Sequence, residues 1–272
     1  MCIRDRFVNL LGMQFVPVPI TGGPTAGQKV YFCIHETRVK DFRAFVNGDK
    51  SFDYARGEVP YTWIGTKSLT QVKGKGWQDP GFNQDETHPV TCVSWEDARA
   101  FTAWLSRREA GLTYRLPTDH EWSCAAGIGD LENASSSPDG KDGKIEDVWP
   151  WGRTFPPADQ MGNYADSALA KKYGKDFGVI DGYNDGFAGT APVMSYPSAR
   201  SRDGLYDLGG NVHEWCEDKY NAKEAWRVLR GGSWAYYFPS ALLSSRRSLF
   251  TPSYRNVYFG FRLVVVAAGS GG

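Results

Sequence analysis

Apolar residues recur at helical spacing in only a few places, and the clearest is the segment SWEDARAFTAWLSRREAG. One apolar stripe runs through this segment and consists of Ala98, Phe101, Trp104 and Leu105. Ser94 precedes the stripe as a natural N-cap, acidic residues follow in the first turn, and Gly111 stands where the helix should end. The pattern therefore predicts one well-defined amphipathic helix.

Elsewhere the apolar and polar positions predict short elements. We expect a hairpin from residues 15–18 and 29–34, with TGGPTAGQ as its turn, and a short helix over 39–46 capped by Thr37. A short strand in TYRLP precedes a second helix, whose T-x-x-E capping box consists of Thr118 and Glu121. Further short strands are predicted at residues 191–195, 212–217, 227–230 and 261–266.

Two long stretches, residues 48–87 and 129–190, are rich in glycine and aspartate and show no regular period. Loops of this length are unusual inside a compact domain unless something organises them, and a bound ion is one candidate. Few helices, many short strands and long loops without a repeat predict one irregular α+β domain. We expect residues 1–9 to be an artefact or a truncated leader, residues 10–267 to form the domain, and 268–272 to be a flexible tail.

The composition of the 272 residues is ordinary for a globular protein, except that aromatic residues reach 14%. A formal net charge of zero indicates neither a nucleic acid partner nor a membrane surface for the whole chain. We see no apolar run of membrane-spanning length and no signal peptide. Charge is uneven, however, because the residues after Glu224 include six arginines but no aspartate, glutamate or lysine.

The cysteines predict no metal ribbon and no disulfide framework. They are odd in number, widely spaced and free of any C-x-x-C pair: Cys2, Cys33, Cys92, Cys124 and Cys216. We therefore expect buried free thiols.

Rings are crowded between Gly231 and Leu263 without the spacing of a core segment. Five of them follow neither period 2 nor period 3.6: Tyr236, Tyr237, Phe238, Tyr254 and Tyr258. Clusters of rings at a surface mark binding sites, and tyrosine offers a large contact area at low entropic cost. A displayed surface is one interpretation, and core packing of the phenylalanines is the alternative.

Seven fragments together resemble a known family. In chain order they are HPVTCVSWEDARAFTAWLS, YRLPTDHEW, PWG, DGFAGTAPV, GLYDLGGNVHEWCEDKY, RVLRGGSW and GFRLV. They are similar to the formylglycine-generating, or sulfatase-modifying factor, domain. The resemblance covers roughly residues 10–267 and implies an α+β fold of the irregular C-type lectin-like kind.

The resemblance also allows a test for catalysis. The enzymes of this family oxidise a substrate cysteine with two cysteines of their own, which bind copper. The matching positions here are Tyr236 and Ala241, and neither side chain can supply the thiolate that such chemistry needs. We therefore predict a non-catalytic protein that binds no copper. The alternatives are an enzyme or enzyme relic acting on a peptide cysteine, and a regulatory module fused to a kinase or another domain.

A non-catalytic branch with this fold, the variable proteins of diversity-generating retroelements, accounts for the crowded rings. In that branch the C-terminal segment is rewritten at asparagine codons, which become codons ending in C. Such codons cannot encode lysine, glutamate, glutamine, methionine or tryptophan, and none of these follows Trp234. The resemblance thus implies a diversified surface over residues 235–259 that binds a protein or glycan ligand.

We expect this surface to lie between fixed scaffold residues. The predicted ligand-binding residues are Ala235, Tyr236, Tyr237, Phe238, Ser240, Arg246, Ser248, Phe250, Tyr254, Asn256 and Tyr258. Arg246 could make bidentate contacts to acidic groups of a ligand. Trp234, Arg247 and Arg255 are interpreted as scaffold.

In the same family calcium holds the long loops, and the resemblance implies two sites. The matching residues of the first are Asn163, Tyr164, Asp185 and Phe187, and those of the second are Gly209, Asn211, Val212 and Glu214. Side-chain and carbonyl oxygens are the ligands that calcium prefers. Alternatively, Asp185 and Asn211 satisfy turn amides as Asx turns.

Overall fold

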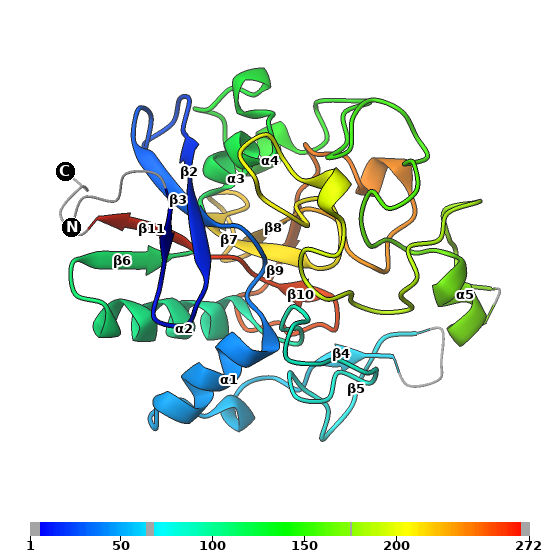
Figure 1. Ribbon diagram of the computed structural model, residues 1–272, viewed down its shortest axis with the longest axis horizontal. Helices are drawn as coiled ribbons and strands as arrows, with labels where there is room; N and C mark the ends of the chain where they lie inside the picture. Colours follow the sequence, from blue (N-terminus) through cyan, green and yellow to red (C-terminus); the bar gives the residue numbers. More distant parts are fainter. Residues whose placement is uncertain (1–5, 64–67, 175, 268–272) are drawn as a thin grey trace.

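A five-stranded antiparallel sheet contains both the first and the last strand of the described chain (Figure 1). The computed structural model describes residues 6–63, 68–174 and 176–267. The strand order is β1 (Phe7–Val8), β2 (Gln14–Pro19), β3 (Lys29–Cys33), β11 (Val264–Ala267) and β6 (Leu112–Arg115). We call the chain from the end of β8 (Arg227–Arg230) to β11 the C-terminal segment. Because β11 pairs with both β3 and β6, the last strand fixes the end of this segment inside the sheet.

The C-terminal half adds a second sheet of four strands. Its order is β10 (Phe259–Gly260), β7 (His213–Lys219), β8 (Arg227–Arg230) and β9 (Ser248–Phe250). The pair β10–β7 is parallel and the other pairs are antiparallel. A two-stranded sheet of β4 (Tyr61–Thr62) and β5 (Thr70–Gln71) lies at the lower edge of the molecule in Figure 1.

The helices are α1 (Val39–Gly48), α2 (Trp95–Arg108), α3 (Asp119–Ala125), α4 (Pro138–Lys141) and α5 (Ser167–Tyr173). Single 3-10 turns are found at Tyr54–Arg56, Gly129–Leu131, Pro197–Ala199 and Pro239–Ala241. None of the helices in the described residues has the length and apolar character required to cross a bilayer.

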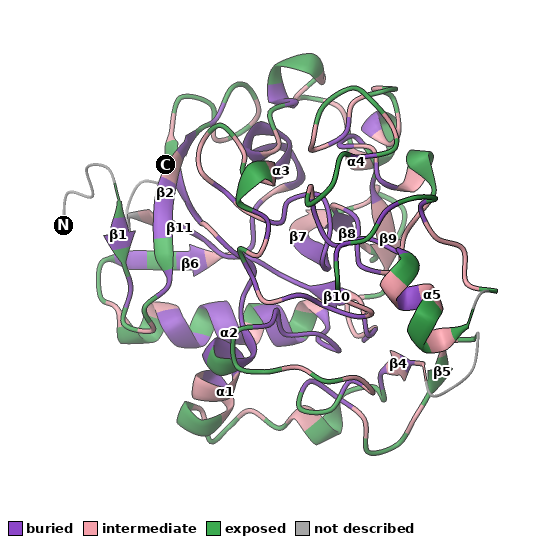
Figure 2. Ribbon diagram, turned by 45° about the vertical axis from the view of Figure 1, so that its right-hand side comes forward, coloured by how far each residue is buried: buried purple, intermediate pink, exposed green. Residues whose placement is uncertain are grey.

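The main core lies between α1, α2 and the five-stranded sheet. Rings from both helices and from the C-terminal segment meet there, with Phe42 against Phe101 at 6.2 Å and Phe101 against Phe261 at 5.5 Å between centroids. The buried faces of α2 and the strands are visible in Figure 2. A second core packs α3 against the other side of the strands through Trp122 and Cys216.

Most predicted elements with clear local signals are present. The hairpin forms as β2 and β3. The Ser94 and Thr118 side chains cap α2 and α3 by accepting the backbone amides of Asp97 and Glu121, whose carboxylates accept the cap amides in return. Helix α1 also forms, but its cap is Arg38 with Asp41 rather than Thr37. The interpretation of Thr37 as the cap was wrong by one residue.

One strand prediction was wrong, and another was correct only in part. Residues 191–195 form turns, because Met194 adopts a positive φ of 66° and its amide donates to a carboxylate oxygen of Asp207. The strand predicted over 261–266 begins later than expected, because residues 261–263 form no strand and β11 covers Val264–Ala267. Parts of residues 1–9 and the whole 268–272 tail lie outside the described residues, as does Cys2, so those predictions are not tested.

Candidate binding surface

Three arginines attach the C-terminal segment to the rest of the molecule. We call Arg247, Arg255 and Arg262 the anchor arginines, and their side chains are at most 3% exposed. Arg247 reaches α3, where its Nε and Nη2 donate to the two carboxylate oxygens of Asp119, each at 3.0 Å. The same guanidinium donates to both carboxylate oxygens of Glu132, at 2.6 and 2.7 Å.

Arg255 joins the segment to the start of α2. Its Nε and Nη2 each lie 2.7 Å from a carboxylate oxygen of Asp97, and its guanidinium stacks on the Tyr54 ring at 3.7 Å. Asp97 also accepts the Ser94 amide, so one buried carboxylate serves both the helix cap and the anchor. The position of residue 255 is therefore fixed by the helix.

Arg262 and Trp234 complete the attachment. The Arg262 guanidinium lies 2.6 to 2.9 Å from the Glu214 carboxylate of β7. The Trp234 ring is 1% exposed and packs between Trp63 and Phe82, with centroids at 5.1 and 5.3 Å. The interpretation of Trp234, Arg247 and Arg255 as scaffold agrees with this burial.

Between the anchors, partly exposed rings gather on one surface. Tyr254 stacks against Phe250 at 4.6 Å and against Tyr61 at 4.9 Å, and Tyr258 lies 5.8 Å from Tyr236. We call these five rings the aromatic surface, and each is intermediate between buried and exposed. Tyr61 of β4 was missed in the sequence, because it lies almost 200 residues from its stacking partner and no local pattern connects them.

Three tyrosines of the aromatic surface, Tyr236, Tyr254 and Tyr258, are uncharged near neutral pH. Burial raises the pKa of Tyr236 to about 12, and burial also raises the pKa values of Tyr254 and Tyr258. Their rings are thus apolar contact areas with neutral hydroxyl groups. Such side chains suit a ligand that offers apolar surface and hydrogen-bonding groups together.

Two further rings extend the aromatic surface toward residues 165–184, a long insertion within the second loop-rich stretch. Tyr237 contacts Phe238 at 3.9 Å between centroids, and Phe238 is 54% exposed. The Tyr237 ring packs directly on Gly178, where a Cβ would lie only 2.0 Å from the ring. The insertion between residues 165 and 184 therefore forms part of the wall beside the surface.

One predicted contact residue is buried. Asn256 is 1% exposed, and its carbonyl accepts the amides of Cys92 and Phe259. We correct the sequence interpretation here, because this asparagine supports the segment from beneath and does not reach its surface. Ala235 and Ser248 are partly exposed, and Ser240 is exposed.

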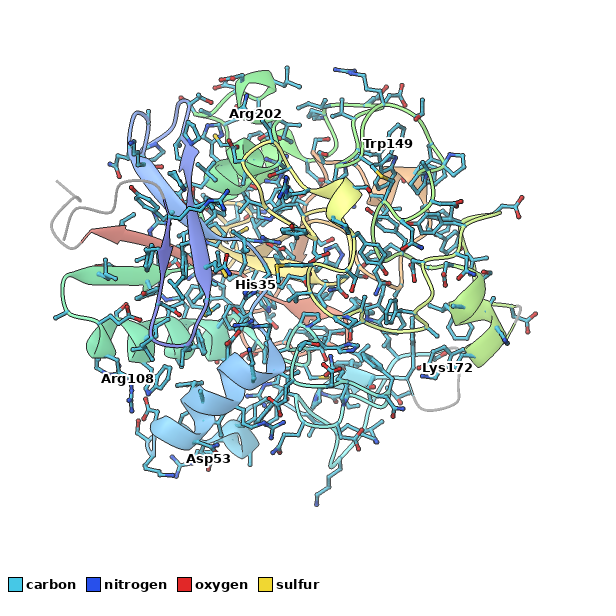
Figure 3. The ribbon with its side chains drawn as sticks, viewed as in Figure 1. His35, Asp53, Arg108, Trp149, Lys172 and Arg202 are labelled. Carbon is cyan, nitrogen blue, oxygen red and sulfur yellow. The ribbon has the colours of Figure 1, made fainter. Side chains whose placement is uncertain are left out.

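The role predicted for Arg246 also changes. The side chain is exposed, but its Nη1 lies 3.0 Å from a carboxylate oxygen of Asp142, so the charge is paired within the chain. Together with Ser240 and Trp149 it lines a cleft of about 480 Å³ that also contains Glu146 and Asp147. Trp149 is labelled in Figure 3. The cleft carries three carboxylates against one guanidinium.

A buried histidine lies under the aromatic surface. His213 is 1% exposed and meets the Tyr236 ring edge-on at 4.8 Å. Burial lowers its pKa to about 4, so the ring is neutral. Within the described residues its Nε2 has no hydrogen-bond partner.

The first predicted calcium set has free oxygens in a buried setting. Asn163 is 1% exposed, and within the described residues its Oδ1 has no hydrogen-bond partner. Burial and the neighbouring Asp166 raise the pKa of Asp185 to about 8. Asp185 also accepts the amides of Tyr164 and Phe187, so the Asx-turn alternative is present as well. An orphaned amide oxygen and an uncompensated buried acid fit a hard cation.

The second predicted set does not fit a cation. The Glu214 carboxylate is occupied by Arg262 and by the Trp122 indole nitrogen at 2.9 Å, while the Gly209 carbonyl accepts the Gly232 amide. Asn211 Oδ1 accepts the amide of Ala191. The described residues contain no group of three or more histidine, cysteine or acidic side chains arranged for a metal.

Neither of the two positions that were matched to catalytic cysteines carries a thiol. Tyr236 belongs to the aromatic surface, and Ala241 ends the 3-10 turn Pro239–Ala241. The free cysteines among the described residues are all buried: Cys33, Cys92, Cys124 and Cys216.

Comparison with known proteins gives a family match over most of the chain. The model of the sulfatase-modifying factor enzyme 1-like domain matches residues 27–267. The inactive C-alpha-formylglycine-generating enzyme 2 of Bos taurus is 36% identical over 164 residues, covering 58% of this chain and 44% of that protein. The formylglycine-generating enzyme of Mus musculus is 31% identical over 214 residues, covering 70% and 49%. The chain thus spans about half the length of the curated relatives it matches.

A solved structure shares the fold. Treponema denticola variable protein 1 superimposes with a TM-score of 0.55 at 18% sequence identity, and the match covers 97% of this chain and 99% of that chain. At this identity the likeness concerns the fold.

Proposed function

The chain belongs to the sulfatase-modifying factor enzyme 1-like family, and we propose that it is a non-catalytic member that binds a protein or glycan ligand. The binding site is the aromatic surface with its extension at Tyr237 and Phe238. Binding rests on large rings among small polar residues, since rings of this kind dominate binding energies where they are well packed.

The observation that carries this proposal is the alternation of anchors and rings along one segment. Each anchor arginine is buried and contacts a carboxylate from a distant part of the chain, while the five rings of the aromatic surface stay partly exposed. A ring can therefore change without removing a contact that attaches the segment. This property is required of a surface whose residues are diversified.

Diversification by a retroelement is supported by two independent features. Lysine, glutamate, glutamine, methionine and tryptophan are absent after Trp234, as expected for codons ending in C. A variable protein of Treponema denticola shares the fold over nearly the whole chain. A near-copy of the coding 3′ end beside a reverse transcriptase gene, differing mainly at adenines, would be the genomic counterpart.

The absence of catalysis is supported by the two positions that would need thiolates, Tyr236 and Ala241. One relative is itself named as inactive. A phenol with a raised pKa and a methyl group can neither attack a thiol nor bind copper as thiolates do.

The cleft beside the aromatic surface favours ligands with a positive or hydroxyl-rich group. Arg246 is already paired with Asp142, and Glu146 and Asp147 have no ion-pair partner among the described residues. The net charge of the cleft is negative and would repel an acidic ligand. Arg246 is therefore not proposed to recognise acidic groups.

We propose that calcium binds at the first predicted site only. Asn163 and Asp185 would bind through side-chain oxygens, and Tyr164 and Phe187 through their carbonyls. The described part of the chain provides no hydrogen-bond donor to either carbonyl. Bound calcium would compensate the buried charge of Asp185 and Asp166 and hold the loop between residues 163 and 187.

Two defined probes test the proposed binding: a glycan array and a displayed library of random peptides. The ligands selected by the native chain should bind at least about tenfold more weakly to a Tyr236→Ser/Tyr254→Ser variant, as for the loss of central rings. Tyr206→Ser is the matched control, because this partly buried tyrosine lies outside the aromatic surface. Ligands that bind both variants as well as the native chain would overturn the assignment of the surface.

A further inference from the structure

A thiol and an imidazole form a close pair on α3, outside the aromatic surface. His120 and Cys124 are one helical turn apart and thus share a face of the helix. The His120 Nε2 and the Cys124 Sγ lie 3.8 Å apart, and the Thr21 hydroxyl is also 3.8 Å from that sulfur. Both are distances at which a thiol takes part in hydrogen bonds.

The pair is held by the loop that follows β2. The Thr21 carbonyl lies 2.6 Å from the His120 Nε2 and fixes the ring. Gly23 has a positive φ of 73° and lies against the same ring, where a Cβ would approach the imidazole to 3.0 Å. His120 is 5% exposed, and its Nδ1 has no hydrogen-bond partner within the described residues. The Thr21 carbonyl thus holds the imidazole with its Nε2 beside the thiol.

Cys124 differs from the other described thiols. Cys33, Cys92 and Cys216 are 0% exposed, and burial raises the pKa of each. Burial alone would raise the pKa of Cys124 too, but hydrogen bonds from His120 and Thr21 outweigh it and hold that pKa below the usual value. The hydrogen bond with Cys124 raises the pKa of His120, against burial and the charge of Lys141.

The thiol is also within reach of small solutes. Cys124 is 8% exposed, and Thr21, whose hydroxyl contacts its sulfur, is itself exposed. All four described thiols belong to core clusters, but Cys124 is the one among them with any exposure.

We infer that Cys124 is a site of reversible oxidation by hydrogen peroxide. The thiolate sulfur attacks one peroxide oxygen, the O–O bond breaks, and the sulfur is oxidised by two electrons to a sulfenic acid. His120 gives its proton to the departing hydroxide, so that water leaves and the imidazole becomes neutral. No second described thiol is exposed to form an internal disulfide, so reduction requires two equivalents of an external thiol.

Peroxide treatment followed by a sulfenic-acid-specific dimedone probe and peptide mass spectrometry tests this inference. The full chain carries Cys2→Ser, so that only the described thiols are compared. We expect the peptide containing Cys124 to be labelled at least about tenfold more than those containing Cys33, Cys92 or Cys216. Equal labelling, or labelling only in denaturant, would overturn the inference.

A second experiment tests the role of His120 through a measurement that a loss of folding alone would not change. The rate of Cys124 alkylation by iodoacetamide should rise with pH at a lower midpoint in the native chain than in His120→Gln. Thr21→Val, which keeps the carbonyl but loses the hydroxyl, should shift the midpoint less. A midpoint unchanged by His120→Gln would contradict the pairing. Should that variant fail to fold, the ranking of the four thiols in the native chain still decides the matter.

Discussion

At the scale of single residues, the structure separates two kinds of arginine after Trp234. The anchor arginines are buried against carboxylates of α2, β7 and the α3 region, whereas Arg246 is exposed beside Asp142. Removing one partner of a buried pair leaves an uncompensated charge and costs several kcal/mol, while exposed pairs contribute little. The contribution of an arginine here depends on burial rather than on the presence of a partner.

Arg255→Met should therefore lower the free energy of unfolding by about 3–5 kcal/mol, because Asp97 would remain buried and unpaired. The measurement is urea denaturation at neutral pH. Arg246→Met is the matched control, with an expected change below about 1 kcal/mol. Similar losses in the two variants would show that burial does not distinguish them.

A second residue-scale prediction concerns pH. Burial and the charge of Arg38 lower the pKa of His35 to about 3, while an unfolded histidine titrates near 6.5. Between these pH values the histidine is protonated in the unfolded chain but neutral in the folded chain. The free energy of unfolding therefore decreases as the pH falls from about 6.5 to 3.

His35→Gln removes this proton-linked loss. The free energy of unfolding of the variant, relative to that of the native chain, should be higher at pH 4 than at pH 7. Denaturation of both proteins at the two pH values measures it. A difference independent of pH would contradict the assigned titration of His35.

At the scale of elements, the long loops depend on local charge compensation. The segment from Asn163 to Phe187 contains α5 and the buried acids Asp166 and Asp185, which share a hydrogen bond through the Asp185 amide. Two carboxylates with little exposure are unfavourable without a cation. This element is thus the part of the fold whose stability should respond to an ion.

Calcium should raise the melting temperature and a chelator should lower it, since a ligand of the native state stabilises by mass action. Differential scanning calorimetry in calcium and in EDTA provides the measurement. Asp185→Asn should abolish the difference, and Glu217→Gln, an acid outside the site, should retain it. A native chain with the same melting temperature in both solutions would remove calcium from the account.

The sequence predicted elements well where a local rule decides the structure. The capping boxes of α2 and α3 and the hairpin of β2 and β3 follow from neighbouring residues. The predicted strand at residues 191–195 failed because Met194 is held at a positive φ by Asp207, which is distant in sequence. Helix α5 was missed within a loop-like insertion, although Asp166 caps it through the Leu169 amide.

The candidate site was predictable only in part for the same reason. The crowding of rings in one segment indicated the surface, and the anchors were distinguished from the rings. The burial of Asn256, the partner of Arg246 and the contribution of Tyr61 depend on contacts across the fold. No local pattern in the sequence contains those contacts.

At the scale of the whole molecule, both sheets and α2 act as a frame for the C-terminal segment. The segment enters from β8, gives one edge strand to each side of the four-stranded sheet, and ends as β11 within the five-stranded sheet. It is therefore fixed at its two ends and at the anchors between them. The frame explains how partly exposed rings can be presented in a defined arrangement.

The central claim is that the frame, and not the rings, stabilises the molecule. Replacing Tyr236, Tyr237 and Tyr254 together with serine and measuring the free energy of unfolding by urea tests it most directly. We expect a loss below about 3 kcal/mol for all three replacements together, less than a single buried large-to-small change often costs. A loss well above that, with each ring contributing as a core residue does, would contradict the account.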